Sequence, residues 1–220
     1  EGGAKYDFIS GLQAGLANIA NSLAAIKKLV FEEHLITQTQ LKGALRGNFE
    51  GIEEEKIRQI LINKAPKYGN DEDYVDLLGR EAYNCYIREI AKYKNIRYGR
   101  GPIGGTYYPS TSVISANVPL GAAVGATPDG RKSGQPLAEG ASPAQGTDRS
   151  GPTAVIKSVS KLPTILITGG QLLNLKFTAE ILESLDGLRS LASLIKTFFR
   201  DLKGWPAVEV KQLKRHLKEQ

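Results

Sequence analysis

Residues 107–161 decide the fold and read YYPSTSVISANVPLGAAVGATPDGRKSGQPLAEGASPAQGTDRSGPTAVIKSVSK. Gly and Pro are concentrated at and just before this stretch, and residues 99–151 hold nearly half of the chain's 24 glycines. Such a composition excludes long helices and favours tight turns and close backbone approach. The stretch also carries the aliphatic residues that disordered tracts lack. We therefore expect an ordered, irregular segment with a function, as is usual for long loops in compact domains.

Strands are expected within this stretch and after it. Branched aliphatic residues over 112–118 and 153–159 favour one strand each. Residues 164–167 and 172–177 flank Gly169 and Gly170 and predict a strand pair or a bulged strand. An amphipathic helix capped by Asp186 follows, with its apolar face formed by Leu188, Leu191, Leu194, Ile195 and Phe198, and Gly204 is its expected end.

Upstream of this stretch, apolar spacing predicts four helices. The first covers 11–35 and turns one apolar stripe toward the core, formed by Leu12, Leu16, Ile19, Leu23, Ile26 and Val30. Thr37 and Gln40 fit a capping box that begins the second helix. Pro66 stops the third, over 53–64. The fourth is capped by Asn70 or Asp71 and extends to Lys94.

Two features of the fourth helix need an interpretation. Asp71, Glu72 and Asp73 lie in its first turn, where the helix dipole favours negative charge; a calcium loop would need a glycine and a distal glutamate that are missing. Cys85, the only cysteine, shares a helical face with Tyr74, Leu78 and Ala82. We therefore expect Cys85 to be a buried structural thiol rather than a nucleophile.

The segment GATPDGRKS comes close to a phosphate loop. Arg131 separates the second glycine from Lys132, and Pro136 follows where a helix would have to begin. The alternative is a Pro-Asp-Gly turn, in which Pro128 presets φ and Gly130 accepts a positive φ. The turn is the favoured interpretation, with Arg131 bonded to neighbouring carbonyls or to a carboxylate.

Composition limits the function classes. The chain has 220 residues, a net charge of +6 and no Met. Part of the positive charge lies in the final ten residues, and no binding motif or aromatic platform accompanies it, so we expect no nucleic-acid partner. No apolar run reaches the ~18 residues of a membrane span, and His34 and His216 lack metal-ligand spacing. One cysteine forms no internal disulfide, which together with the lack of a signal peptide predicts a cytoplasmic location.

Long motifs of this chain resemble the C-terminal half of the glycyl radical enzymes, a family that includes pyruvate formate-lyase, the glycerol and propanediol dehydratases and choline trimethylamine-lyase. The resemblance extends over about residues 1–205. It is carried, in the family's order, by GGAKYDF, NSLAAIKKLVFEE, NKAPKYGNDEDYVD, SANVPLG, VGATPDGRKSGQPLAEG, SPAQGTDRSGPTAVIKSVSKL and GGQLLNLKF.

The resemblance implies an α/β fold, here part of a ten-stranded α/β barrel: a C-terminal half-barrel with surrounding helices. In the family, an activating enzyme with an iron–sulfur cluster and S-adenosylmethionine installs a radical on a backbone glycine, and the radical passes to a cysteine. The protein's part is to keep these groups in a closed, dry cavity. We expect no cofactor bound to this chain itself, and its partners would be the missing parts of the barrel or an intact homologue, with an activating enzyme for the parent family.

The same resemblance identifies few site residues. The motif Arg-Val-x-Gly-Tyr of the radical glycine occurs nowhere in this chain, and Cys85 does not match the family's radical cysteine. We therefore expect no catalytic residue, no radical glycine and no metal ligand here. Alignment on Asn117 brings Ser112 to a substrate-facing position, so Ser112, Ser115 and Asn117 are candidate substrate-binding residues; strand hydroxyls that bond the backbone are the alternative.

We expect a partial domain over 1–205, resembling the pyruvate formate-lyase domain, and a divergent basic tail over 206–220. The leading hypothesis is a fragment of a glycyl radical lyase or acyltransferase that contributes barrel and cavity and is inactive alone. Two alternatives stay open: a split subunit that is active with a partner chain, and a non-catalytic structural or binding fragment. The substrate, whether pyruvate, glycerol or choline, is left undetermined.

Overall fold

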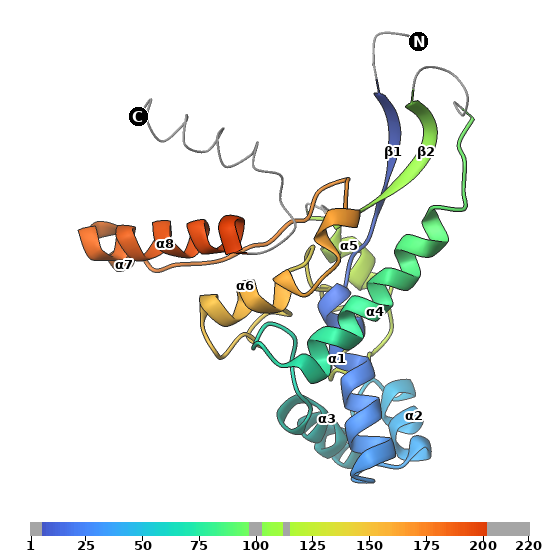
Figure 1. The fold of residues 1–220 in the computed structure, drawn as a ribbon. Helices are drawn as coiled ribbons and strands as arrows, with labels where there is room; N and C mark the ends of the chain where they lie inside the picture. The colour runs from blue at the N-terminus through green and yellow to red at the C-terminus, as the bar shows by residue number, and fades with distance from the viewer. Residues whose placement is uncertain (1–5, 97–102, 112–114, 202–220) are drawn as a thin grey trace.

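The computed structural model of the chain describes residues 6–96, 103–111 and 115–201 (Figure 1). Its elements follow the order β1 (Tyr6–Leu12), α1 (Leu16–Ala25), the π-helix η1 (Ile26–Glu32), α2 (Gln38–Arg46), α3 (Ile52–Lys64), α4 (Asp73–Ile90), β2 (Ile103–Ser110), α5 (Asn117–Ala122), α6 (Pro152–Ser160), the 3-10 turn η2 (Thr164–Leu166), α7 (Ala179–Glu183) and α8 (Leu185–Asp201).

The two described strands pair in parallel, although the helices α1 to α4 lie between them in the sequence. The register joins Tyr6 to Ile103 and Leu12 to Ser110, with an irregularity between Asp7 and Phe8. Helices α1 to α4 form the crossover between the strands, as a parallel pair requires (Figure 1). The described residues thus contain a β–α–β unit and a majority of helix, where a five-stranded half-barrel was expected.

Several predicted strands are wrong. Ser115 adopts a left-handed φ of 59° and α5 begins at Asn117, so 115–118 is a turn followed by a helix; 112–114 lie outside the described residues. Residues 153–159 belong to α6, which Gly151 at φ 81° and Pro152 at the first helical position initiate. The branched residues of α6 favoured a strand, but they pack as the buried face of a helix, with Val155, Ile156 and Val159 almost fully buried.

The predicted strand pair around Gly169 and Gly170 is also absent from the described chain. Residues 164–166 form η2, and 172–177 have no regular structure. The glycines bond to the end of β2 instead, since the Gly169 amide donates to the Pro109 carbonyl at 2.9 Å and the Gly170 carbonyl accepts from Thr111 at 3.0 Å. A Cβ on Gly169 would lie 2.5 Å from the Tyr108 ring, so this close approach requires glycine.

The first predicted helix is right in type and wrong in extent and orientation. Its first residues belong to β1, α1 begins at Leu16, and the π-helix η1 follows from Ile26. Ile19 and Leu23 are exposed, whereas the buried side of α1 carries small residues such as Ala17, Ala20 and Ala24. The reason is the close approach of α4, where a Cβ on Gly79 would lie 3.0 Å from the Ala20 Cβ.

The other predicted helices form, but some caps and ends differ. Helix α8 begins at Leu185, so Asp186 lies in its first turn and is not its cap, and the expected end at Gly204 lies outside the described residues. Helix α4 ends at Ile90 rather than at Lys94.

Thr37 and Gln40 form the capping box of α2, and α3 ends just before Pro66. Helix α4 begins at Asp73 after Glu72, without a side-chain cap from Asn70 or Asp71. Asp71 pairs with lysines of α6 and its neighbourhood, and Asn70 bonds to the loop 147–150.

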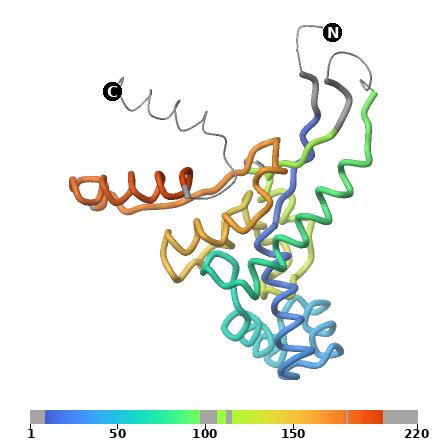
Figure 2. Tube along the Cα trace, viewed as in Figure 1, coloured from blue at the N-terminus to red at the C-terminus, as the bar shows by residue number. Residues whose placement is uncertain are grey.

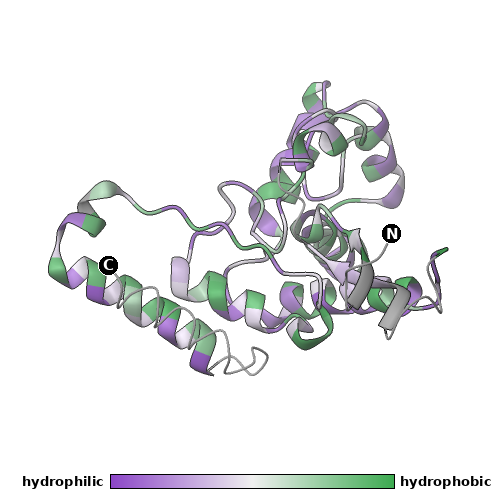
Figure 3. Cartoon of the chain, turned by 90° about the horizontal axis from the view of Figure 1, so that it is seen from above, coloured by the Kyte–Doolittle hydropathy of each residue, from purple (hydrophilic) through white to green (hydrophobic). Residues whose placement is uncertain are grey.

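Two apolar cores organise the helices. The first joins α1, α4 and α6 with the long loop before α6 and includes the buried rings of Tyr68 and Tyr83; the second joins η1, α2 and α3 around Phe49 and Leu61. The loop over 123–151 lies along α1 (Figure 2). The backbone amide of Ala138 in this loop donates to the Asn18 side chain of α1. Helices α7 and α8 extend from this body as an arm on which apolar and polar residues alternate (Figure 3). None of the described helices combines the length and the hydropathy that crossing a membrane requires.

Candidate functional site

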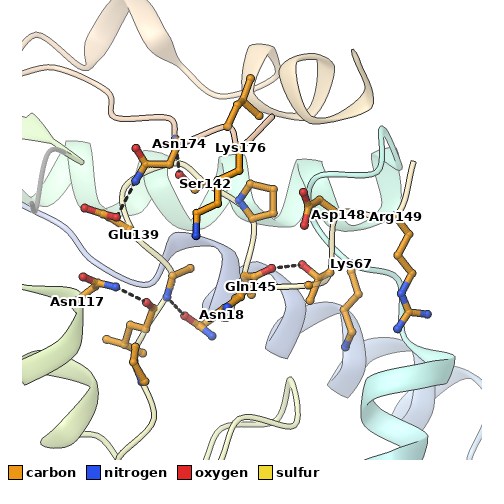
Figure 4. Close-up of a pocket in the computed structure, with 18 of the residues that line it drawn as sticks. Asn18, Lys67, Asn117, Glu139, Ser142, Gln145, Asp148, Arg149, Asn174 and Lys176 are labelled. Carbon is orange, nitrogen blue, oxygen red and sulfur yellow. Dashed lines mark hydrogen bonds between the residues drawn. The ribbon is translucent and has the colours of Figure 1, made fainter. Parts of the chain in front are cut away.

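A cavity of about 940 Å³ lies between α1, the loop 129–152 and the segment 174–178 (Figure 4). Its lining combines apolar side chains with polar side chains of both charges. The polar and charged residues include Asn18, Lys67, Asn117, Asp129, Glu139 and Asn174. The described lining contains neither Cys nor His, and its polar side chains offer hydrogen bonds and charge.

The predicted Pro-Asp-Gly turn is present, and its residues Asp129 to Arg131 also line the cavity. The Thr127 amide donates to the Arg131 carbonyl at 2.9 Å, and Gly130 has φ 95°. The Arg131 guanidinium is buried and donates to five carbonyl oxygens of the same loop, those of Gly121, Val124, Gly125, Lys132 and Gln135. Arg131 therefore shapes the loop from inside and is not available to a ligand.

Asn18 connects α1 to this loop at the base of the cavity. Its Nδ2 donates to Asp129 Oδ2 at 2.7 Å, and its Oδ1 accepts from the Ala138 amide at 2.7 Å. The other Asp129 oxygen accepts from Thr127 Oγ1 and from the Arg131 amide. Both oxygens of this buried carboxylate are thus occupied within the protein, as buried charge requires.

A row of amides and one carboxylate forms the upper rim. Asn117 Nδ2 donates to the Leu137 carbonyl at 3.1 Å, while Asn174 Nδ2 donates to Glu139 Oε2 at 2.7 Å (Figure 4). The backbone amide of Asn174 also donates to Ser142 Oγ at 2.9 Å. The rim therefore holds α5, the loop after it and the segment 174–178 in one arrangement.

The three predicted substrate-binding residues have different positions. Asn117 lines the cavity, at the first position of α5. Ser115 is exposed, and its backbone amide lies 3.4 Å from Glu139 Oε1. Ser112 lies outside the described residues. The strand expected over 112–118 is replaced at 115–118 by a turn and the start of α5, and binding of substrate by Ser115 and Asn117 stays a prediction.

Sequence reasoning missed Glu139, Asn174 and Asn18 as cavity residues. Glu139 follows a turn-forming Gly-Gln-Pro segment and precedes Gly140, whose φ is 57°. A carboxylate between two turn signals could have indicated a functional loop residue. Asn18 gave no such indication, because it lies on an ordinary helix. Only the packing of α1 against the loop brings its amide into the cavity.

Lys67 is the most perturbed titratable group of the cavity. Its Nζ donates to the Leu61 carbonyl at 2.7 Å and lies 3.4 Å from the Asp129 carbonyl. Burial, opposed by the Asp129 charge and helped by Arg149, lowers the pKa of Lys67 to about 8. Such shifts are frequent at functional sites.

The carboxyl ends of β1 and β2 carry a second polar group. The Gln13 amide donates to the Ser110 carbonyl at 2.9 Å, and Ser110 Oγ reaches the carbonyls of Gly169 and Gly170. Beside them, both side-chain polar atoms of Gln171 and the Gln13 Oε1 are shielded from solvent, and no hydrogen bond is found for these atoms. Ligand sites of α/β proteins gather at this end of parallel strands.

Other candidate groups lie elsewhere. No group of three metal-ligating side chains exists in the part of the chain that the structure describes. His34 contacts only the Val30 carbonyl, and His216 lies outside the described residues. The prediction of a buried Cys85 is wrong, because Cys85 is exposed on α4, whose buried face carries Val75, Asp76, Gly79 and Tyr83.

Comparisons with known proteins agree with this architecture. A family model described as pyruvate formate lyase-like matches residues 1–121, and one described as glycine radical matches residues 137–217. The chain is 60% identical over 205 residues to the probable dehydratase YbiW of Escherichia coli (strain K12), which covers 93% of this chain and 25% of that protein.

Two further relatives extend the comparison. The trans-4-hydroxy-L-proline dehydratase of Clostridioides difficile is 39% identical over 201 residues, which are 90% of this chain and 24% of that protein. The glycerol-bound structure of the B12-independent glycerol dehydratase from Clostridium butyricum superposes with a TM-score of 0.83 at 48% identity, over 93% of this chain and 25% of that one. The chain thus spans about a quarter of the length of these relatives.

Proposed function

We propose a function that proceeds from one premise: this chain belongs to the glycyl radical enzyme family. The chain contributes part of the barrel wall and of the substrate cavity of a radical dehydratase or lyase, and it is inactive alone. Relatives named as dehydratases of glycerol and of trans-4-hydroxy-L-proline support a small hydroxylated substrate. The reaction belongs in an anaerobic, reducing cytoplasm, which a radical and a single free thiol both favour.

The unfinished sheet is the observation that carries the proposal. β1 and β2 pair only with each other among the described strands, so the outer edge of each has no described partner. Unpaired edges are a liability that barrels abolish by closure. The shielded polar atoms of Gln13 and Gln171 lie beside the carboxyl ends of the same strands and need partners as well. Further strands of a barrel would supply both.

Within such a barrel, the residues of this chain would bind and orient substrate. The Asn117 amide and the Glu139 carboxylate present a donor and acceptors suited to hydroxyl groups, and Asn174 holds Glu139 in place at 2.7 Å. The loop that Arg131 stiffens keeps this rim rigid, which is what positioning of a reactive substrate requires. Closure of the cavity by the rest of the barrel would exclude water.

No residue of this chain is assigned as the site of the radical. The motif Arg-Val-x-Gly-Tyr does not occur in its sequence, and Cys85 lies on the exposed side of α4, outside the described cavity lining. When present, a glycyl radical supplies the hydrogen-atom abstraction that begins the family's chemistry. The residues described here do not fit that role, so no reaction step is assigned to them.

Electron paramagnetic resonance tests this proposal. The purified chain is treated anaerobically with an activating enzyme and S-adenosylmethionine, beside an intact glycerol dehydratase as the positive control. We expect a glycyl doublet from the control and none from the chain. A doublet from this chain without any partner would show that the assignment is wrong.

A split subunit is the second candidate function, favoured by the match to the glycine radical family model over 137–217 in the absence of the motif. A second chain carrying Arg-Val-x-Gly-Tyr is added to the same activation reaction. A signal or dehydratase activity that requires both chains supports the split subunit. Stable binding of the two chains without any signal supports the third hypothesis, a non-catalytic structural or binding fragment.

A further inference from the structure

Two cations share one wall of the cavity. Lys67 and Arg149 both line it, and in Figure 4 the ammonium and the guanidinium point the same way. They are close enough for the Arg149 charge to lower the pKa of Lys67. Neither side chain forms an ion pair with a carboxylate within the described residues. Arg149 is exposed and Lys67 is partly buried, so the cavity wall presents two positive charges, of which only Lys67 is strongly influenced by the Asp129 carboxylate.

The neutral side chain of Asn70 bonds to the backbones of both Lys67 and Arg149. Asn70 Nδ2 donates to the carbonyls of Lys67 at 2.9 Å and Thr147 at 2.8 Å. Asn70 Oδ1 accepts from the amides of Arg149 at 2.8 Å and Ser150 at 3.0 Å. One side chain with all of its hydrogen-bonding groups used thus joins the two loops that carry Lys67 and Arg149. The backbones of Lys67 and Arg149 are therefore held close together by Asn70.

The acidic residues nearby form no ion pair with Lys67 or Arg149 among the described residues. The oxygens of Asp129 are occupied by Asn18, Thr127 and the Arg131 amide, although the Asp129 charge raises the pKa of Lys67 by more than the Arg149 charge lowers it. The Asp148 carboxylate points away from the Lys67 ammonium in Figure 4. The Lys67 ammonium itself is bonded to backbone carbonyls, which carry no net charge.

We propose that Lys67 and Arg149 form a binding site for a small oxyanion of the phosphate or sulfate class. An anion between the two cations would be attracted to both, and a guanidinium presents paired donors that match the oxygens of such an anion. The partly desolvated ammonium would contribute a point charge whose effect water screens little. This site involves neither radical chemistry nor the amide rim. Anion binding can therefore be tested independently of the proposed function.

The pH dependence follows from Lys67. Its pKa of about 8 reflects burial and the facing Arg149, opposed by Asp129. An anion prefers the protonated ammonium, so its affinity should decrease as the pH rises above that value. By linkage, binding near pH 8 should take up protons, because the bound anion raises the pKa of Lys67. Calorimetry in two buffers of different ionisation enthalpy measures this uptake.

Titration of the full chain with inorganic phosphate tests the site, with methyl phosphate in a second series to distinguish a free anion from a monoester. Arg149→Gln keeps the backbone amide that Asn70 holds and should weaken binding about tenfold or more, as loss of a charge-assisted contact does. Lys64→Met is the matched control: Lys64 is exposed on α3, outside the cavity lining, and its removal should leave affinity unchanged.

Three outcomes would overturn the proposal: no binding of either phosphate, equal weakening by Lys64→Met and Arg149→Gln, or affinity that does not decrease above pH 8. Lys67→Met serves as a second variant where circular dichroism shows it folded, and it should abolish the proton uptake. Proton uptake that persists in this variant would assign the titration to another group and contradict the role of Lys67.

Discussion

At the scale of single residues, Cys85 shows how a one-position error in a helical face changes a chemical conclusion. Its Sγ lies on the solvent side of α4, 3.1 Å from an Arg88 nitrogen, while Tyr83 is fully buried two residues earlier. An exposed thiol contributes little to packing. The expected effects of changing Cys85 are therefore those of a surface residue.

We predict that native Cys85 reacts with a thiol reagent as fast as the urea-unfolded chain, and that Cys85→Ser changes the free energy of unfolding by less than about 0.5 kcal/mol. Stopped-flow alkylation and urea denaturation measure the two quantities. Strong protection of the native thiol, or a large loss of stability, would restore the buried position that the sequence pattern indicated.

At the scale of elements, Lys161 joins α4 to the end of α6. Its Nζ lies 2.8 Å from Asp76, 2.9 Å from Asp71 and 2.7 Å from Asp73, and Asp76 also accepts from Ser158 Oγ. The Asp76 side chain is fully buried. Removal of one partner of a buried ion pair leaves a buried charge uncompensated, which is far more costly than loss of a surface pair.

We predict that Lys161→Met lowers the free energy of unfolding by about 3 kcal/mol near neutral pH. Burial raises the pKa of Asp76 even beside Lys161. A raised folded-state pKa gives a contribution to stability that is present at low pH and lost as the pH rises through that pKa. The cost of Lys161→Met should therefore shrink on acidification, as the Asp76 carboxyl becomes neutral.

Urea denaturation over a pH series checks this prediction. Lys157→Met is the control, because the exposed Lys157 pairs with Asp71 at 3.1 Å and a surface pair contributes at most about 1 kcal/mol. Equal effects of the two variants, or a cost of Lys161→Met that does not vary with pH, would mean that Asp76 does not depend on Lys161 for its charge compensation.

At the scale of the whole molecule, apolar side chains are exposed on one arm of the described chain. The arm of α7 and α8 exposes Ile181, Leu182, Leu185 and Leu188, and Leu185 is 71% exposed (Figure 3). The outer edges of β1 and β2 have no described partner. Exposed apolar patches and open strand edges both promote association.

We predict that the chain alone self-associates as its concentration rises. Light scattering coupled to size-exclusion chromatography measures this, and the double variant Leu185→Lys with Leu188→Lys should reduce the association. Arg189→Lys, on the same helix and exposed, should have no effect. A monomer throughout the concentration series would show that the arm and the strand edges are covered within this chain.

Much of the local structure could be predicted from the sequence, because its signals act over a few residues. The capping box of Thr37 and Gln40, the stop at Pro66 and the turn at Gly130 depend on φ restrictions and on hydrogen bonds between neighbours. The long motifs also indicated the family, which the family models confirm. Asn117 lines the cavity, and its role in binding substrate stays a prediction.

Only the tertiary structure decided which faces are buried and which residues meet. Ala17, Ala20 and Ala24 form the buried face of α1 because Gly79 lets α4 approach closely, a distant contact that no local apolar pattern encodes. The branched residues of α6 suit a strand or a buried helix equally well until the packing selects one. Likewise, Lys67 and Arg149 lie 82 positions apart, and contacts such as those of the Asn70 side chain bring them to one cavity. Long-range contacts of this kind arise from the whole fold, so the sequence by itself determined the family and the turns, and packing determined the site.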